Sequence, residues 1–137
     1  MKAQDIFDTV VTHLYTQGRR AVLAGGGCLY LAPDGTQCAV GALLEPDGPA
    51  CQFRGGVTDL IAAHPDDVPE WLAENLVLLK GLQQQHDIRD DAPRRAAEAA
   101  EAAHFGRTLE AGLRHVAARN GLDYRAEHYP TPPEDWK

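Results

Sequence analysis

Residues 28–44 read CLYLAPDGTQCAVGALL, and the expected fold depends on this stretch. Two short apolar runs flank the tripeptide Pro33-Asp34-Gly35, in which proline presets its backbone angle and aspartate tolerates the next turn position. Glycine accepts the left-handed conformation that closes a three-residue hairpin loop. The resulting register places Tyr30 opposite Cys38, and side chains then alternate between two largely apolar faces. The stretch therefore predicts a β-hairpin that other elements cover on both sides.

Helical periodicity predicts the elements that cover the hairpin. Apolar residues recur at the 3.6-residue period in four segments, which are residues 5–17, 57–63, 67–85 and 94–120. Gly18 and Gly121 are expected to end the first and last of these helices. Apolar residues occupy so much of the circumference of the third helix that we expect it at the centre of the fold.

Length and composition fit one small domain. The chain has 137 residues, of which 44% are hydrophobic and 24% charged, as is usual for a globular protein. We expect an α+β fold with one β-hairpin packed among about four to five helices over residues 1–121. Residues 122–137, rich in proline and aromatic residues, are expected to form an extended C-terminal tail.

The negative charge is concentrated in one part of the sequence. The net charge is −7, and residues 59–91 hold eight acidic residues against Lys80 and Arg89. Such a segment disfavours direct binding to nucleic acid or to an anionic membrane and favours a protein partner with a basic surface. Simple solvation of an exposed helix face is the alternative. The predicted partner-binding residues are Asp66, Asp67, Glu70, Glu74, Asp87, Asp90 and Asp91.

Neither a signal peptide nor an apolar run of about 20 residues is recognisable in the sequence. Cys28, Cys38 and Cys51 lack C-x-x-C spacing. We expect them to be small buried thiols in a reducing compartment. We therefore expect a cytoplasmic location, free thiols and no cofactor.

Two other functional classes stay open. A small hydrolase or metal-dependent enzyme would use Cys38 as a nucleophile or His86, beside Asp87, as a general base. A zinc site would need Cys28, Cys38 and Cys51 to converge with a histidine. A homo-oligomeric scaffold would assemble through the alanine-rich first half of the segment 94–120.

The hairpin stretch and a later LQQQHD run resemble a recurrent group of small uncharacterised phage, prophage and bacterial proteins. The shared patterns are C-x-Y-x-x-x-D-G-x-x-C-A-x-G and L-Q-x-x-H-D. The matching residues here are Cys28, Tyr30, Asp34, Gly35, Cys38, Ala39, Gly41, Leu82, Gln83, His86 and Asp87. The resemblance implies a phage setting and an action on host or defence machinery, and it implies no mechanism. We expect a non-enzymatic interaction protein of the phage-inhibitor type, whose partner is a basic, nucleic-acid-binding protein.

Overall fold

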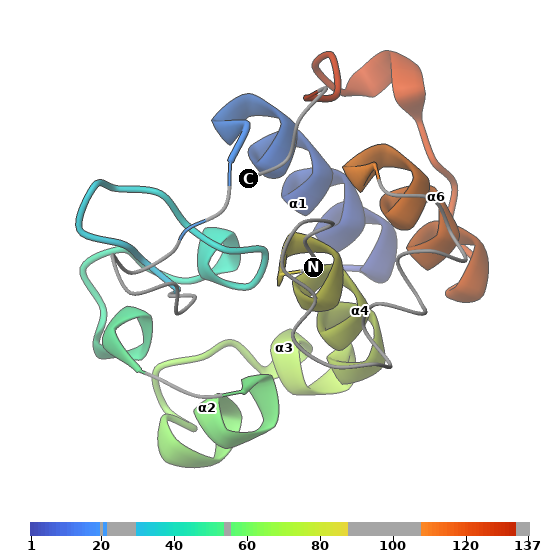
Figure 1. The fold of residues 1–137 in the computed structure, drawn as a ribbon. Coiled ribbons are helices and arrows are strands. Elements are labelled where there is room, and N and C mark those ends of the chain that lie inside the picture. Colours follow the sequence, from blue (N-terminus) through green and yellow to red (C-terminus); the bar gives the residue numbers. More distant parts are fainter. Residues whose placement is uncertain (20, 22–29, 54–55, 88–107, 134–137) are drawn as a thin grey trace, which may run out of the picture.

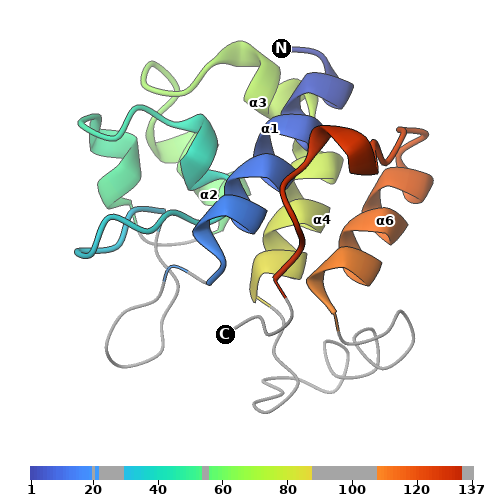
Figure 2. The same cartoon turned by 90° about the horizontal axis from the view of Figure 1, so that it is seen from above.

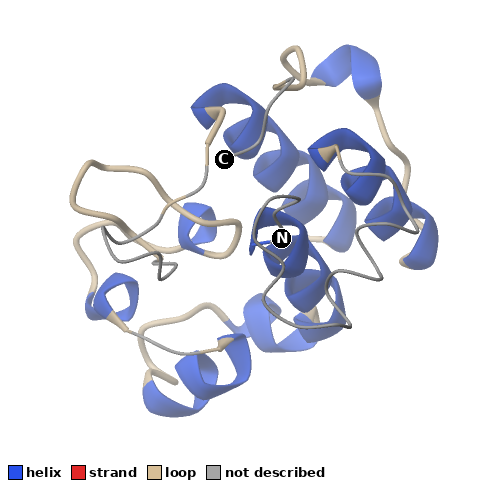
Figure 3. Ribbon diagram, viewed as in Figure 1, coloured by secondary structure: helices blue, strands red, loops and turns tan. Residues whose placement is uncertain are grey.

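The structure, a computed structural model, describes residues 1–19, 21, 30–53, 56–87 and 108–133. Five α-helices and no β-strand are found in those residues (Figure 1, Figure 3). The α-helices are α1 (Ala3–Gln17), α2 (Val57–Ala63), α3 (Glu70–Glu74), α4 (Leu76–Asp87) and α6 (Leu109–Arg119). Short 3-10 helices are η1 (Gly41–Leu43), η2 (Pro49–Gln52) and η3 (Ala126–His128).

Helix α4 lies at the centre of the described fold and contacts α1, α2, α3 and α6. Each of the five helices buries at least one large apolar side chain completely in a common core. Examples are Phe7, Leu60, Leu72, Leu79 and Leu113. The expectation of a central apolar helix is confirmed for α4, with one exception, because Val77 is 78% exposed.

The predicted α+β fold with a β-hairpin is wrong. The predicted register survives as one isolated antiparallel bridge between Leu31 and Gln37. Gly35 also has the expected positive φ of 88° and its amide closes the loop onto the Ala32 carbonyl at 2.9 Å. Beyond Gln37 the chain curls into a turn and then into η1, so no second strand forms.

Contacts with α1 explain why the ladder stops. The Gln37 amide donates to Gln17 Oε1 at 2.7 Å, and the Gln37 carbonyl accepts from Gln17 Nε2 at 2.9 Å. The Cys38 carbonyl accepts from the Ala42 amide at 3.1 Å, which starts the helical turn. Helix η1 then contacts α1. The two short apolar runs are thus buried by packing on a helix, which overrides their strand propensity.

The predicted helix over residues 67–85 is two helices with a break at Asn75. The Asn75 side chain donates from Nδ2 to the Trp71 carbonyl at 2.8 Å. The Asn75 amide instead reaches the Leu72 carbonyl at 3.2 Å, so a side-chain bond replaces a regular helical one. The first of the two helices also starts later than the predicted residue 67, since α3 begins at Glu70 with Pro69 as its N-cap.

The last helix also starts later than predicted. Thr108 has an extended backbone and its Oγ1 accepts from the Ala111 amide at 3.1 Å, so it is the N-cap of α6. Residues 94–107 of the predicted helix, with the alanine-rich half, lie outside the described residues.

Several local predictions are confirmed. Helix α1 covers the expected residues 5–17, and α2 has the expected bounds. Gly18 and Gly121 end their helices with φ angles of 75° and 66°, the left-handed region that glycine enters without steric cost.

The start of the C-terminal segment packs on α1 and α6. The segment runs over the space between these two helices (Figure 2). Tyr124 and Tyr129 each meet the Phe7 ring edge-on at a centroid distance of 6.4 Å. The Arg114 guanidinium of α6 lies 4.0 Å from the centre of the Tyr124 ring, a cation–π contact. Aromatic packing therefore holds residues 124–129 against the helices.

Candidate functional site

The first candidate site is an acidic surface over α2, α3 and the turn between them. Residues 56–79 contain five acidic residues and no lysine or arginine. All five side chains are exposed; they belong to Asp59, Asp66, Asp67, Glu70 and Glu74. We refer to these five residues as the acidic surface.

The carboxylates of the acidic surface are almost without counter-charges. Asp67 has one partner, His64 Nδ1 at 3.3 Å. Asp66, Glu70 and Glu74 take part in no ion pair with any residue that the structure describes. Glu70 and Glu74 are one helical turn apart on α3 and so lie on the same face of that helix. An incoming cationic surface could pair with these carboxylates without displacing an existing partner.

The structure does not describe the other predicted acidic residues in full. Asp87 is the last residue of α4, and its side chain, like that of His86, lies outside the described part of the chain. Asp90 and Asp91 lie outside it altogether. The extension of the binding surface beyond α3 therefore stays a prediction.

The described thiols are buried rather than exposed as a nucleophile would require. The Cys38 side chain is 1% exposed, and its Sγ accepts a hydrogen bond from the Gly41 amide at 3.2 Å. The Cys51 Sγ donates to the Glu45 carbonyl at 3.2 Å. Burial, with a smaller effect of the Glu45 charge, raises the pKa of the Cys51 thiol above its ordinary value, which disfavours the reactive thiolate.

The described residues contain neither a candidate metal-ion cluster nor a candidate membrane-spanning helix. No group of three or more histidine, cysteine, aspartate or glutamate side chains suited to a metal ion occurs among the described residues. Cys28, the third member of the predicted zinc set, lies outside them. None of the helices in the described ranges has the length and apolar character needed to cross a membrane.

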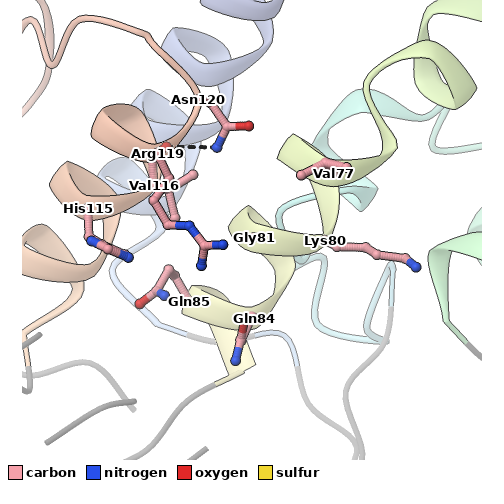
Figure 4. Close-up of a pocket in the computed structure, with 9 residues that line it drawn as sticks. All are labelled: Val77, Lys80, Gly81, Gln84, Gln85, His115, Val116, Arg119 and Asn120. Atoms are coloured by element: carbon pink, nitrogen blue, oxygen red, sulfur yellow. Dashed lines mark hydrogen bonds between the residues drawn. The ribbon is translucent and has the colours of Figure 1, made fainter. Parts of the chain in front are cut away.

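The second candidate site is a hollow of about 230 Å³ between α4 and α6, which the sequence did not predict. Nine of the described residues line it, and they repeat at helical spacing on the facing sides of the two helices (Figure 4). They are Val77, Lys80, Gly81, Gln84, Gln85, His115, Val116, Arg119 and Asn120. We call this cavity the α4–α6 hollow.

Two glycines set the shape of the α4–α6 hollow. A Cβ atom on Gly81 would lie 3.6 Å from Val116 Cγ1, so the missing side chain leaves room at the floor. A Cβ atom on Gly112 would overlap the amide of Gln85, so the backbone of α6 makes space for that side chain. No sequence pattern predicts the hollow, because its residues come from two segments about 30 positions apart in the chain.

Comparisons with known proteins give no match: no family model, no curated protein and no solved structure is significantly similar to this chain.

Proposed function

We propose that this chain is a non-enzymatic interaction protein that binds a basic surface on a partner protein. The observation that carries the proposal is the acidic surface, whose Asp66, Glu70 and Glu74 carboxylates are exposed and make no ion pair within the described residues. Carboxylates placed this way raise the association rate with a basic partner and repel nucleic acid and anionic lipid.

Helix stability explains only part of this surface. Glu70 stands in the first turn of α3, where the helix dipole favours an acidic side chain. Asp66 and Asp67 precede the helix, and Glu74 is its last residue, where the dipole disfavours a carboxylate. A basic partner would account for the whole set, and Asp87, Asp90 and Asp91 would extend the contact.

The resemblance to phage and prophage proteins supports a more specific form of the proposal. In this form the chain works in the cytoplasm as an inhibitor, and its partner is a host or defence protein that uses a basic surface to bind nucleic acid. The acidic surface would occupy that basic surface in place of the nucleic acid backbone, since both present closely spaced negative charges.

Affinity capture from a bacterial lysate, with partners identified by mass spectrometry, tests the proposal. The test variant is Glu70→Lys with Glu74→Lys. The control is Asp123→Lys with Glu127→Lys, which makes the same charge change at exposed positions of the C-terminal segment, outside the acidic surface. We expect basic proteins to be captured by the wild type and the control and lost by the test variant. Equal capture by all three chains would contradict the proposal.

A further inference from the structure

We propose that the α4–α6 hollow binds a small organic anion, in which one carboxylate or phosphate group is attached to a compact apolar body. This inference is independent of the acidic surface. It rests on a largely buried glutamine and an arginine that make no hydrogen bond or ion pair, respectively, with a described side chain, and on an exposed apolar rim. These three features lie together in one hollow.

Gln85 supplies the buried polar group. Its side chain is only 8% exposed and lines the hollow, yet it makes no hydrogen bond to any residue that the structure describes. An amide on a largely buried residue loses part of its hydration, and such groups in native proteins generally find a hydrogen-bond partner. The close approach of the Gly112 backbone holds the Gln85 amide in place. A ligand in the hollow would supply the hydrogen bonds that this amide lacks.

Arg119 supplies the positive charge. Its guanidinium extends from α6 toward Gly81 and Gln85, across the mouth of the hollow (Figure 4). Arg119 makes no ion pair with a described residue, in contrast to Arg114, which pairs with Glu110 at 2.9 Å one turn earlier. A position in the last turn of α6 suits an arginine on electrostatic grounds alone. The orientation of the Arg119 guanidinium over Gln85 also indicates a ligand. A guanidinium in this place can donate two parallel hydrogen bonds to a carboxylate or a phosphate.

Lys80 adds a second cation at the rim. It is exposed, and in Figure 4 its ammonium group points away from α6. Lys80 also makes no ion pair with a described residue, and its four-carbon stem can swing toward a bound anion. In a chain of net charge −7, a hollow with these two unpaired cations stands out from the rest of the surface.

The remaining walls favour an apolar body on the anion. Val77 is 78% exposed at the edge of the hollow, although it lies on α4, the central helix of the described fold. Val116 and the bare backbone of Gly81 form the floor. The volume of about 230 Å³ is below the roughly 300–1,000 Å³ of pockets that hold drug-sized ligands. The hollow therefore suits a body of about one ring or one branched side chain.

The test is a titration of the ¹⁵N-labelled full chain, followed by backbone amide shifts. Benzoate and phenyl phosphate are the anionic probes, benzamide is the neutral analogue, and inorganic phosphate carries the charge without the apolar body. We expect saturable shifts at Gly81, Gln85 and Arg119 with one or both aromatic anions, at a Kd of about 1 mM or tighter. The aromatic anion that binds more tightly shows whether the hollow prefers a carboxylate or a phosphate. Benzamide and inorganic phosphate should bind at least about tenfold more weakly.

Three variants locate the binding. Arg119→Gln should weaken binding of the aromatic anion at least about tenfold, whereas Arg19→Gln, the same change at an exposed residue that does not line the hollow, should leave it unchanged. Gln85→Leu should abolish binding without lowering the melting temperature, since the Gln85 amide makes no hydrogen bond with a described residue that the fold would lose. The proposal is overturned if neither aromatic anion binds saturably, or if benzamide or inorganic phosphate binds equally well. Unchanged affinity in both Arg119→Gln and Gln85→Leu would overturn it too.

Discussion

The Tyr129 hydroxyl donates a hydrogen bond of 2.5 Å to Oδ1 of Asp8, and this bond ties the C-terminal segment to the first helix. Arg125 Nη1 lies 3.4 Å from the other oxygen of the same carboxylate. The Tyr15 and Tyr124 hydroxyls form a second link of 2.7 Å between α1 and the same segment. Residues 124–129 are therefore part of the folded structure through polar as well as aromatic contacts.

Tyr129→Phe should lower the free energy of unfolding by about 1–2 kcal/mol, because it removes a hydrogen bond to a charged, half-buried carboxylate and keeps the ring packing. Urea denaturation followed by circular dichroism measures the change. A double-mutant cycle with Asp8→Asn serves as the control, and the two substitutions should be clearly non-additive. Unchanged stability of Tyr129→Phe would show that the bond adds nothing in solution.

Alkaline pH should unfold the protein through its tyrosines. Burial is the main cause that raises the pKa of Tyr15, Tyr124 and Tyr129 above the ordinary value of 10.0. The folded state therefore favours the protonated phenols. Their contribution to stability is complete below pH 10 and is lost as the pH rises through the raised pKa values. Absorbance at 295 nm and circular dichroism should report ionisation and unfolding together, in one transition above pH 10. Ionisation of all tyrosines near pH 10 in a folded chain would contradict this.

Gly41→Ala should destabilise the protein by about 3 kcal/mol. A Cβ atom at this position would overlap the backbone carbonyl of Tyr30, which cannot move aside as a flexible side chain would. Gly56→Ala is the matched control, because a Cβ atom there meets nothing within 4 Å. Thermal denaturation of the two variants makes the comparison. Equal melting temperatures would mean that η1 does not pack on Tyr30 as described.

The Asp34 carboxyl should titrate well below its ordinary range. Hydrogen bonds from the Thr36 side chain and amide are the main causes, and Arg19 adds to them, so that the pKa of Asp34 falls from 3.8 to about 2. Because folding lowers the pKa, the ionised Asp34 carboxylate stabilises the turn above pH 3.8. This stabilisation is lost as the pH falls through about 2. A ¹³C-detected NMR titration should give a higher pKa in Thr36→Val than in Arg19→Gln. The reverse order would assign the effect to the ion pair.

Local signals in the sequence were reliable where the decisive contacts are local. Gly18, Gly35 and Gly121 have the positive φ angles expected from their places after a helix or in a turn. The bounds of α2 follow from its apolar period and the His64-Pro65 pair that ends it.

Errors arose where a side chain bonds to the backbone and decides its course, whether that side chain is distant or near in the sequence. The hairpin was expected from two apolar runs, but Gln17, which lies 20 residues before Gln37, takes up the Gln37 amide and carbonyl. The break at Asn75 depends on one side-chain bond to Trp71 that periodicity does not register. An asparagine within an apolar period was a usable warning, since its amide competes with helical hydrogen bonds.

The two candidate sites differ in whether the sequence alone can predict them. The exposed acidic residues of α2 and α3 could be read from the chain, because five carboxylates fall in 24 residues without a lysine or arginine. The α4–α6 hollow could not, because it requires the packing of Gly81 against Val116 and of Gln85 against Gly112. Val77, which belongs to the apolar segment 67–85, was expected to be buried and is instead exposed at the edge of the hollow.

The salt dependence of the association rate tests the central claim, that the acidic surface recognises a basic partner, most directly. Stopped-flow mixing of the chain with a captured partner should give an association rate constant that falls steeply between about 50 and 500 mM NaCl, since salt screens charge steering. Glu70→Lys with Glu74→Lys should associate at least about tenfold more slowly at low salt, with a flatter dependence and an unchanged melting temperature. A double variant that associates at the wild-type rate, with the wild-type salt dependence, would contradict the claim.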